Sequence, residues 1–552
     1  MKLWKRSFLC GMTAVLLVGS VAACSSKTDN DASGTKQEGN GSTTSSEQKV
    51  TKLKMLGPAG INKYIKFDDR ENYPVWAEID KLMKNEGLEL DNELVPAEQY
   101  EVVLKTRMAS GSNLPDIVNI SKLDNTTVLN LAKQGVLLDL NPLIEKYSNG
   151  NIKKMYDVEF PYAKKSTTSP DGKMYWFSNL HKKTYKGKDP APVSLTMLIR
   201  KDWLDKLHLP VPTTADEYLE TLKKFRELDA NGNGNKDEVL VYNYPGQFTG
   251  AIAQWFGLGT GITAVDVENK KVVSPWYQDG VKDYFRYMQR LVKEGVLDTS
   301  LIEATGEQNQ QKMTENQVAS LHDYNLENYQ EPTIKGGGEY LPLMPLKAVE
   351  GITPAVQQEP HFLIFNKYAI TKDCKDVAAA IKFFDMVYSE KYADLMFWGI
   401  EGQTYKVESN GAKVYINNNG SAEELAKTKQ VTGNMLMGDT VFPRVQFSNL
   451  EFELSTAPKY KADNELQVLN YKPYFVNMNN NFLAIPDDKQ LETKTKILTN
   501  LNTYSTELAT KLALGQKSLD DWDQYIAELK KLGLDQLIEI DQQLLDRYNS
   551  IQ

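Results

Sequence analysis

Short apolar runs alternate with helical patterns along most of this 552-residue chain. Leu53–Leu56 and Leu114–Ile120 have the length of buried strands. Between them, residues 74–85 place Val75, Ile79, Leu82 and Met83 at helical spacing. Strands that alternate with helices favour an α/β fold. At roughly 150 residues per domain, the length corresponds to two to four domains.

Capping residues and apolar spacing predict further helices. Thr214 and Glu217 form a predicted capping box, followed by Tyr218, Leu219, Leu222 and Phe225 on one helical face. Near the C-terminus, Leu491–Leu514 and Ser518–Leu532 are predicted amphipathic helices.

The first residues indicate export. Lys2, Lys5 and Arg6 precede an apolar stretch that ends at Ala23, the pattern of a secretory signal over residues 1–23. Val21-Ala22-Ala23-Cys24 is typical of a bacterial lipobox, in which Cys24 becomes the lipid acceptor and carries palmitate. An uncleaved anchor with an incidental cysteine is the alternative, and both place the chain outside the cytoplasm. Residues 24–49 are polar, which predicts a disordered tether.

Composition excludes several classes of protein. The formal net charge of −9 argues against nucleic acid as a partner, because phosphate binding needs a basic surface. Three cysteines are too few for a disulfide scaffold. With residues 1–23 removed and Cys24 lipidated, only Cys374 remains, so we expect no intrachain disulfide.

A loop rich in oxygen ligands begins at Asp229. Counted from Asp229, side-chain oxygens fall at positions 1, 3 and 5, glycine stands at position 6, and acidic residues stand at positions 9 and 10. This spacing is typical of a calcium loop. Leu240 replaces the glutamate that an EF-hand carries at position 12, so a complete EF-hand is not expected. A metal-free Asn-Gly turn is the alternative, and a bound Ca²⁺ would be structural.

Enzyme motifs are weak. The sequence lacks a Walker A loop, HExxH, GxSxG and CxxC. A glycosidase needs only two carboxylates at a set distance, which sequence spacing does not exclude. We expect that the chain is not an enzyme.

The segment from Leu198 to Glu238 resembles the lipoprotein solute-binding proteins of carbohydrate ABC importers, solute-binding family 1. It contains LIRKDWLDKL, the VPTT motif and the Asp229 loop. GSNLPD at Gly111–Asp116, GIEGQTY at Gly399–Tyr405 and SLDDWDQY at Ser518–Tyr525 agree with this family. The calcium-containing alginate-oligosaccharide-binding proteins are the structural type that we expect.

The resemblance implies a two-lobed α/β periplasmic-binding-protein-like fold, with a hinge and a ligand cleft between the lobes. We expect residues 50–170 and 316–370 in lobe 1, and residues 171–315 and 371–552 in lobe 2. By the same resemblance, the calcium ligands are expected to be Asp229, Asn231, Asn233, Asn235 (through its carbonyl), Asp237 and Glu238.

Sugar-binding residues are harder to predict, because a buried aromatic side chain is as often core as ligand contact. Our candidates are aromatic residues near expected crossings between the lobes, glycine-rich turns and the GIEG segment, together with two nearby acids. They are Trp176, Trp255, Asp323, Tyr324, Trp398, Glu401 and Tyr405.

The expected function is that of a lipid-anchored monomeric receptor on the extracellular face of a bacterial cell membrane. It would capture an oligosaccharide and deliver it to the permease subunits of an ABC importer. A secreted carbohydrate-active hydrolase or lyase, or a binder of a non-sugar solute such as a peptide, is the alternative.

Overall fold

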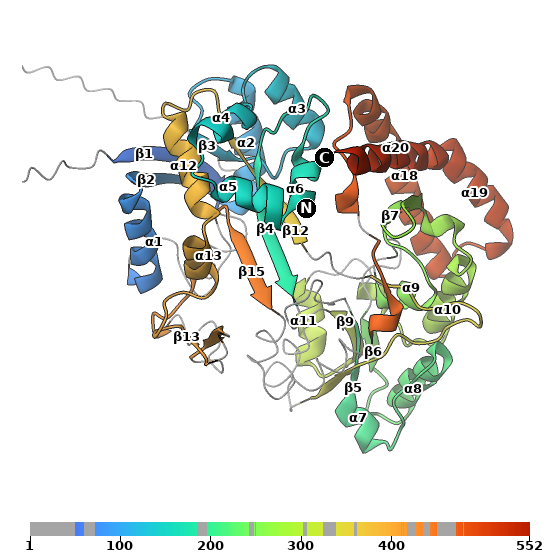
Figure 1. Cartoon of the computed structure of the whole chain (residues 1–552). Coiled ribbons are helices and arrows are strands. Elements are labelled where there is room, and N and C mark those ends of the chain that lie inside the picture. Colours follow the sequence, from blue (N-terminus) through green and yellow to red (C-terminus); the bar gives the residue numbers. More distant parts are fainter. Residues whose placement is uncertain are drawn as a thin grey trace, which may run out of the picture. The chain divides into compact units, whose positions relative to one another are not determined.

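The computed structural model describes residues 50–59, 72–184, 196–241, 248, 250–301, 306–323, 338–357, 362–409, 411, 413–416, 427–433, 442–449, 471–478 and 480–551. These residues form an α/β fold with two large sheets, which confirms the expected fold class (Figure 1). Over the same ranges, none of the helices combines the length and apolar character that crossing a bilayer requires. The predicted signal, tether and Cys24 lie outside the described residues.

The first sheet has six strands in the order β15-β4-β12-β3-β1-β2. Strand β1 pairs in parallel with β2 and β3, whereas β12 runs antiparallel to β3 and β4. Strand β15 lies parallel to β4 at the edge. The strands span Thr51–Pro58 (β1), Leu88–Val95 (β2), Ile117–Asn119 (β3), Phe177–Thr184 (β4), Phe362–Ile370 (β12) and Val445–Asn449 (β15).

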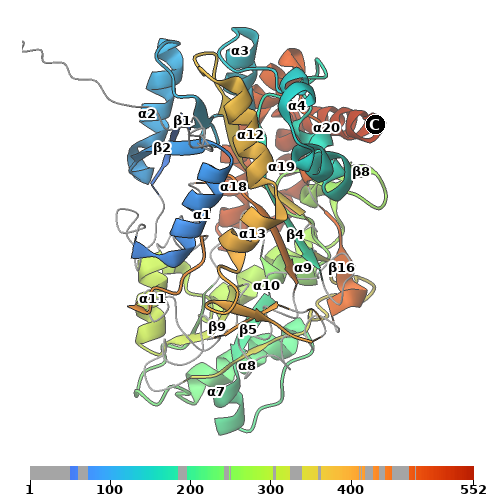
Figure 2. The ribbon, with the colours of Figure 1, turned by 60° about the vertical axis from the view of Figure 1, so that its left-hand side comes forward.

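Helices bury both faces of this sheet. Met55 of β1 packs in the cluster that contains α1 (Pro74–Asn85), α12 (Val377–Val387) and α13 (Glu390–Phe397), which lie together in Figure 2. The next residue, Leu56, packs on the opposite face with α2 (Ala97–Ser110) and α3 (Asn125–Lys133). Met55 and Leu56 are therefore both apolar although their side chains lie on opposite faces of the sheet.

The second sheet has four strands in the order β10-β5-β9-β6. They span Thr196–Arg200 (β5), Val239–Val241 (β6), Val318–Asp323 (β9) and Tyr340–Pro342 (β10). The core around this sheet includes residues of α7 (Lys201–Lys206), α8 (Ala215–Glu227), α9 (Ala251–Trp255), α10 (Val281–Lys293), α18 (Asp488–Ala513), α19 (Trp522–Lys531) and α20 (Leu534–Ser550).

Two predicted helix starts illustrate how local chemistry sets these elements. Helix α8 begins with the predicted capping box: the Thr214 hydroxyl accepts from the Glu217 N–H, and the Glu217 carboxylate accepts from the Thr214 N–H. Helix α1 begins at Pro74, whose fixed backbone suits the first helical position. Both predictions are confirmed.

The chain passes between the two sheets three times. It leaves the first sheet after β4, returns between β10 and β12, and leaves again after β15 for the C-terminal helices that pack on the second core. Each sheet is therefore built from segments that are discontinuous in sequence.

The sheets group several elements differently from the expected lobe boundaries. Residues 177–184, 377–397 and 445–449 are expected in lobe 2, but β4 and β15 belong to the first sheet, and α12 and α13 pack on it. Residues 318–323 and 340–342 are expected in lobe 1, but β9 and β10 pair with strands of the second sheet. We therefore propose that lobe 1 includes β4, β15, α12 and α13, and that lobe 2 includes β9 and β10.

A buried ion pair ties α18 to α20. Asp541 is 1% exposed and interrupts an apolar face of α20. The Lys494 ammonium donates to one oxygen of the Asp541 carboxylate, and the Thr263 hydroxyl donates to the other at 2.8 Å. Both carboxylate oxygens therefore have partners, as a buried charge requires.

Lys494→Met is expected to lower the free energy of unfolding by about 3 kcal/mol, because it leaves a buried carboxylate without its cation. Urea denaturation followed by circular dichroism measures the change. Lys496 of the same helix is the matched control, because its 2.6 Å ion pair with Glu492 is exposed to water. Lys496→Met is expected to change stability little, and equal losses in the two variants would contradict the assignment.

Candidate ligand-binding site

A cavity of about 800 Å³ is lined by elements of both lobes, and we call it the interlobe groove. One wall comes from the start of α3 and from Ser166 at the end of α6 (Pro161–Thr167). The facing wall comes from residues 261–263, 480 and 483–486 and from α18 and α20. Ile262, Leu498 and Leu544 of this wall pack on the second core, whereas Ala484 and Ile485 pack on the cores of the first sheet. This volume lies within the range of ordinary ligand sites, which favour boundaries between domains.

The start of α3 gives the groove a polar edge. Asp124 is the N-cap: its carboxylate accepts from the Thr127 N–H at 2.9 Å and from the Thr127 hydroxyl at 2.8 Å. Partial burial opposes ionisation, but these hydrogen bonds hold the pKa of Asp124 below its usual range. Asp124 therefore carries a negative charge at neutral pH.

Lys367 orients the neighbouring Asn125. A β-bulge, with Asn366 at φ 55°, interrupts the pairing of β12 with β4 just before Lys367. The Lys367 ammonium lies 5.2 Å from the centre of the Trp176 ring and donates to Asn125 Oδ1 at 2.6 Å. Burial lowers the pKa of Lys367. Because an ammonium only donates, Asn125 keeps its N–H₂ group for a ligand.

The facing wall combines amides and hydroxyls with aliphatic side chains. Asn480, Asn502 and Thr263 line it together with Ile262, Leu483 and Leu498. The Lys494–Asp541 pair lies in the same wall. Hydroxyl and amide groups beside aliphatic surface suit a ligand that has both hydroxyl groups and C–H faces.

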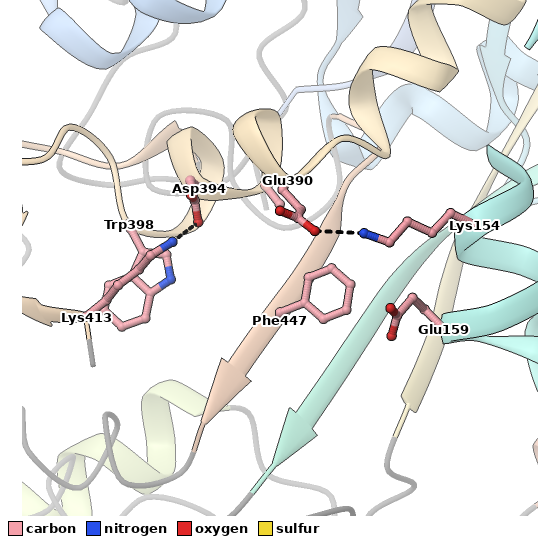
Figure 3. Close-up of a pocket in the computed structure, with 8 residues that line it drawn as sticks. Lys154, Glu159, Glu390, Asp394, Trp398, Lys413 and Phe447 are labelled. Atoms are coloured by element: carbon pink, nitrogen blue, oxygen red, sulfur yellow. Dashed lines mark hydrogen bonds and ion pairs between the residues drawn. The ribbon is translucent and has the colours of Figure 1, made fainter. Parts of the chain in front are cut away.

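A second cavity, of about 330 Å³, contains the predicted Trp398 (Figure 3). Trp398 is 6% exposed, and its ring packs at 5.8 Å on that of Tyr405, the first residue of β13 (Tyr405–Val407). Lys413 pairs with Asp394, and Lys154 pairs with Glu390 at 2.7 Å. Phe447 of β15 and Glu159 complete the lining. We call this cavity the Trp398 pocket.

The turn after Trp398 requires glycine. Gly399 has φ 85°, and a Cβ atom there would lie 2.4 Å from the Thr404 hydroxyl oxygen. That hydroxyl donates to the Trp398 carbonyl at 2.6 Å. The GIEG segment therefore fixes the backbone that carries Trp398.

The structure brings together only some of the predicted sugar-binding residues. Trp398 and Tyr405 are in contact, and Glu401 is exposed in the adjoining turn. Trp176 and Trp255 are buried in separate cores, one in each lobe. Asp323 is the last residue of β9, and Tyr324 lies outside the described residues.

Sequence analysis missed the polar residues of the groove. Asp541 had a usable signal, because it stands between Ile540 and Leu544 on the buried face of α20. Lys494 and Asn125 had none, because polar residues in a helix are ordinarily solvated.

The Asp229 loop forms a compact turn after α8. The Asp229 carboxylate accepts from the N–H groups of Asn233 at 3.0 Å and Gly234 at 2.9 Å. The Asn231 and Asn233 amides donate to Asp237. Glu238 is 1% exposed, and its Oε2 has no hydrogen-bond partner.

This environment suits a cation. Burial raises the pKa of Glu238, and a carboxylate oxygen buried without a partner is costly unless a cation or donor meets it. Among the described residues, the structure contains no group of three or more His, Cys, Asp or Glu side chains that could hold a metal ion as they lie.

Two proteins whose names describe the binding of carbohydrates are similar to this chain. The chain is 25% identical over 459 residues to the fructooligosaccharide ABC transporter substrate-binding protein FusA of Streptococcus pneumoniae, covering 80% of this chain and 81% of FusA. It is 27% identical over 335 residues to the polygalacturonan/rhamnogalacturonan-binding protein YtcQ of Bacillus subtilis, covering 59% and 62%.

Solved structures agree in fold. An EF-hand mutant of S. pneumoniae FusA in complex with fructo-nystose matches with a TM-score of 0.72 and 21% identity, over 91% of this chain and 100% of that one. The alginate-binding protein AlgQ2 without calcium ion matches with a TM-score of 0.64 and 22% identity, over 90% and 98%. Residues 69–394 match the profile of the family described as bacterial extracellular solute-binding protein. The chain therefore belongs to the bacterial extracellular solute-binding protein family.

Proposed function

We propose that this protein is the receptor of an ABC importer and that it captures an oligosaccharide in the interlobe groove. The observation that carries the proposal is that the groove takes its hydroxyl and amide groups from both lobes. A ligand that contacts both walls favours closure of the lobes, and a closed receptor presents a distinct surface to a membrane permease.

The groove lining contains groups that suit both the hydroxyl groups and the C–H faces of a sugar. The Asn125 N–H₂ group and the Thr126, Asn480 and Asn502 side chains would bind hydroxyl groups, and Leu483 and Leu498 would contact C–H faces. We retain Trp398, Glu401 and Tyr405 as a second sugar-contact region at the Trp398 pocket. Contacts from Trp176, Trp255, Asp323 and Tyr324 remain predictions.

A carbohydrate-active hydrolase or lyase is the second candidate, because carboxylates line both cavities. Membership of a binding-protein family favours the receptor. A receptor returns its ligand unchanged, whereas an enzyme releases shortened products.

Asn125→Ala is expected to weaken oligosaccharide binding about 3- to 10-fold, because it removes one hydrogen bond to the ligand. Isothermal titration calorimetry with a panel that includes kestose and nystose measures the change, and chromatography checks that the sugar is recovered intact. Asn130, exposed on the same helix, provides the matched control Asn130→Ala. Cleavage of the sugar by the pure protein would contradict the receptor assignment.

We also propose that the Asp229 loop holds a structural Ca²⁺ through Asp229, Asn231, Asn233, the Asn235 carbonyl, Asp237 and Glu238. The buried Glu238 oxygen that lacks a partner supports this. Rotation of the Asn231 and Asn233 amides would present oxygen atoms in place of N–H₂ groups. The ion would supply positive charge that offsets the carboxylates of the loop.

Calcium at 1 mM is expected to stabilise the protein by about 0.4–1.4 kcal/mol, given the 10⁻⁴–10⁻³ M affinities of extracellular modules. Thermal melts with chelator or added calcium measure the effect, and Asp229→Ala is expected to abolish it. Asp266 accepts from the Asn269 N–H in another turn, so Asp266→Ala is the control that keeps the response. A wild-type melting temperature indifferent to calcium would refute the site.

Finally, we propose that lipid on Cys24 anchors the protein as a monomer to the extracellular face of the cell membrane. Cys374, the other cysteine of the processed chain, lies in the turn after β12 and is partly buried, and burial raises the pKa of its thiol to about 12.

Cys24→Ser is expected to move the protein from the membrane fraction to the medium or periplasm, because it removes the lipid acceptor. Immunoblots of fractionated cells measure this. Cys374→Ser provides the control and is expected to stay with the membrane. Membrane retention of the Cys24→Ser protein would rule out the lipid anchor.

A further inference from the structure

We propose that the interlobe groove selects uncharged oligosaccharides and discriminates against uronates, with the Lys494–Asp541 pair as the selective element. The inference rests on the proposed function and deepens it by naming the charge class of the ligand.

The charges that line the groove are unbalanced. Among the described residues, its lining contains two carboxylates, Asp124 and Asp541, and one basic side chain, Lys494. Lys494 is bound to Asp541, so the charge without a cationic partner in the lining is that of Asp124. The charged side chains of the lining therefore sum to one negative charge, which Lys367 behind the wall offsets in part.

The Lys494 ammonium is not available for an ion pair with a ligand, because it is already paired with Asp541. Its side chain is 20% exposed, and Asp541 is buried behind it. A uronate that drew the ammonium toward itself would leave the Asp541 carboxylate with only the Thr263 hydroxyl. Removing one partner of a buried ion pair costs far more than an exposed pair returns. A neutral sugar can accept hydrogen bonds from Lys494 and leave the pair intact.

A second cation, outside the lining, is also engaged. Lys367 lies behind the groove wall against the Trp176 ring, and its ammonium donates to Asn125 Oδ1. At this position the groove is therefore lined by the uncharged amide of Asn125 and not by the Lys367 ammonium. Asp124, held ionised by Thr127, repels a second carboxylate near this edge.

The Trp398 pocket follows the same pattern. Its two lysines, Lys154 and Lys413, are each paired with a carboxylate of the pocket, and a third acid, Glu159, pairs with Lys182 at 3.6 Å. A uronate that extended to this pocket would meet no unpaired lysine among its described lining residues.

The test compares uncharged and anionic oligosaccharides of equal length by calorimetry on the intact mature protein in 0.15 M salt. The neutral set contains nystose, maltotetraose, xylotetraose and the methyl ester of tetragalacturonate, and the anionic set contains tetragalacturonate and an alginate tetrasaccharide. We expect the tightest ligand to be neutral and every uronate to bind at least 100-fold more weakly. A uronate within tenfold of the best neutral sugar overturns the inference but leaves the receptor function standing. If neither set binds, the proposed function fails and the inference fails with it.

A specificity switch tests the role of the ion pair. Asp541→Asn releases the Lys494 ammonium, and we expect the preference for neutral over anionic sugar to fall at least tenfold. Asp546→Asn, at an exposed position of the same helix, is the control that keeps the preference. Near-ultraviolet circular dichroism checks that the Asp541→Asn protein is folded. If the folded variant keeps the same preference, the ion pair does not determine the selectivity. If that variant does not fold, the wild-type comparison still decides the charge class.

Discussion

Among the described elements, three neighbouring strands of the first sheet stand where the chain passes between the two sheets. Strand β4 leads toward the second sheet, β12 returns from it, and β15 precedes the C-terminal helices. Because β15, β4 and β12 are hydrogen-bonded side by side, a change in the angle between the lobes must bend all three together. Neighbouring strands that are shared in this way suit a hinge motion between the lobes, which would allow a ligand to be captured between them.

The bulge in β12 links these strands to the groove. At Asn366 the strand departs from regular pairing, and the next residue contacts the segment before α3 and the first residue of α3. The Lys367 N–H donates to the Ser121 hydroxyl at 2.8 Å, and the Lys367 ammonium donates to Asn125. One irregular residue of a crossing strand thus helps to position a groove amide. Asparagine is one of the few residues that adopt a positive φ readily, which suits it to this bulge.

The parts of the fold that depend on local chemistry were predictable. Helix α1 has its proline and its apolar spacing within twelve residues, and the Thr214–Glu217 capping box is complete within four. Lobe membership was harder, because an apolar run such as that of α12 does not specify which sheet it covers. The groove was not predictable for the same reason: Asn125, Thr263 and Asp541 come from segments that only the tertiary fold brings together. Trp398 was found in a cavity because its turn has a recognisable motif.

The scarcity of thiols has a practical consequence. The sequence has three cysteines, and Cys374 is the one that the structure describes; its partial burial and raised pKa keep it poor in thiolate. Cys374 is therefore expected to react little with thiol-specific labels, so that introduced cysteines can be labelled selectively. One new cysteine on an exposed helix of each lobe would carry a dye pair, and the distance between the dyes would report lobe closure in single molecules.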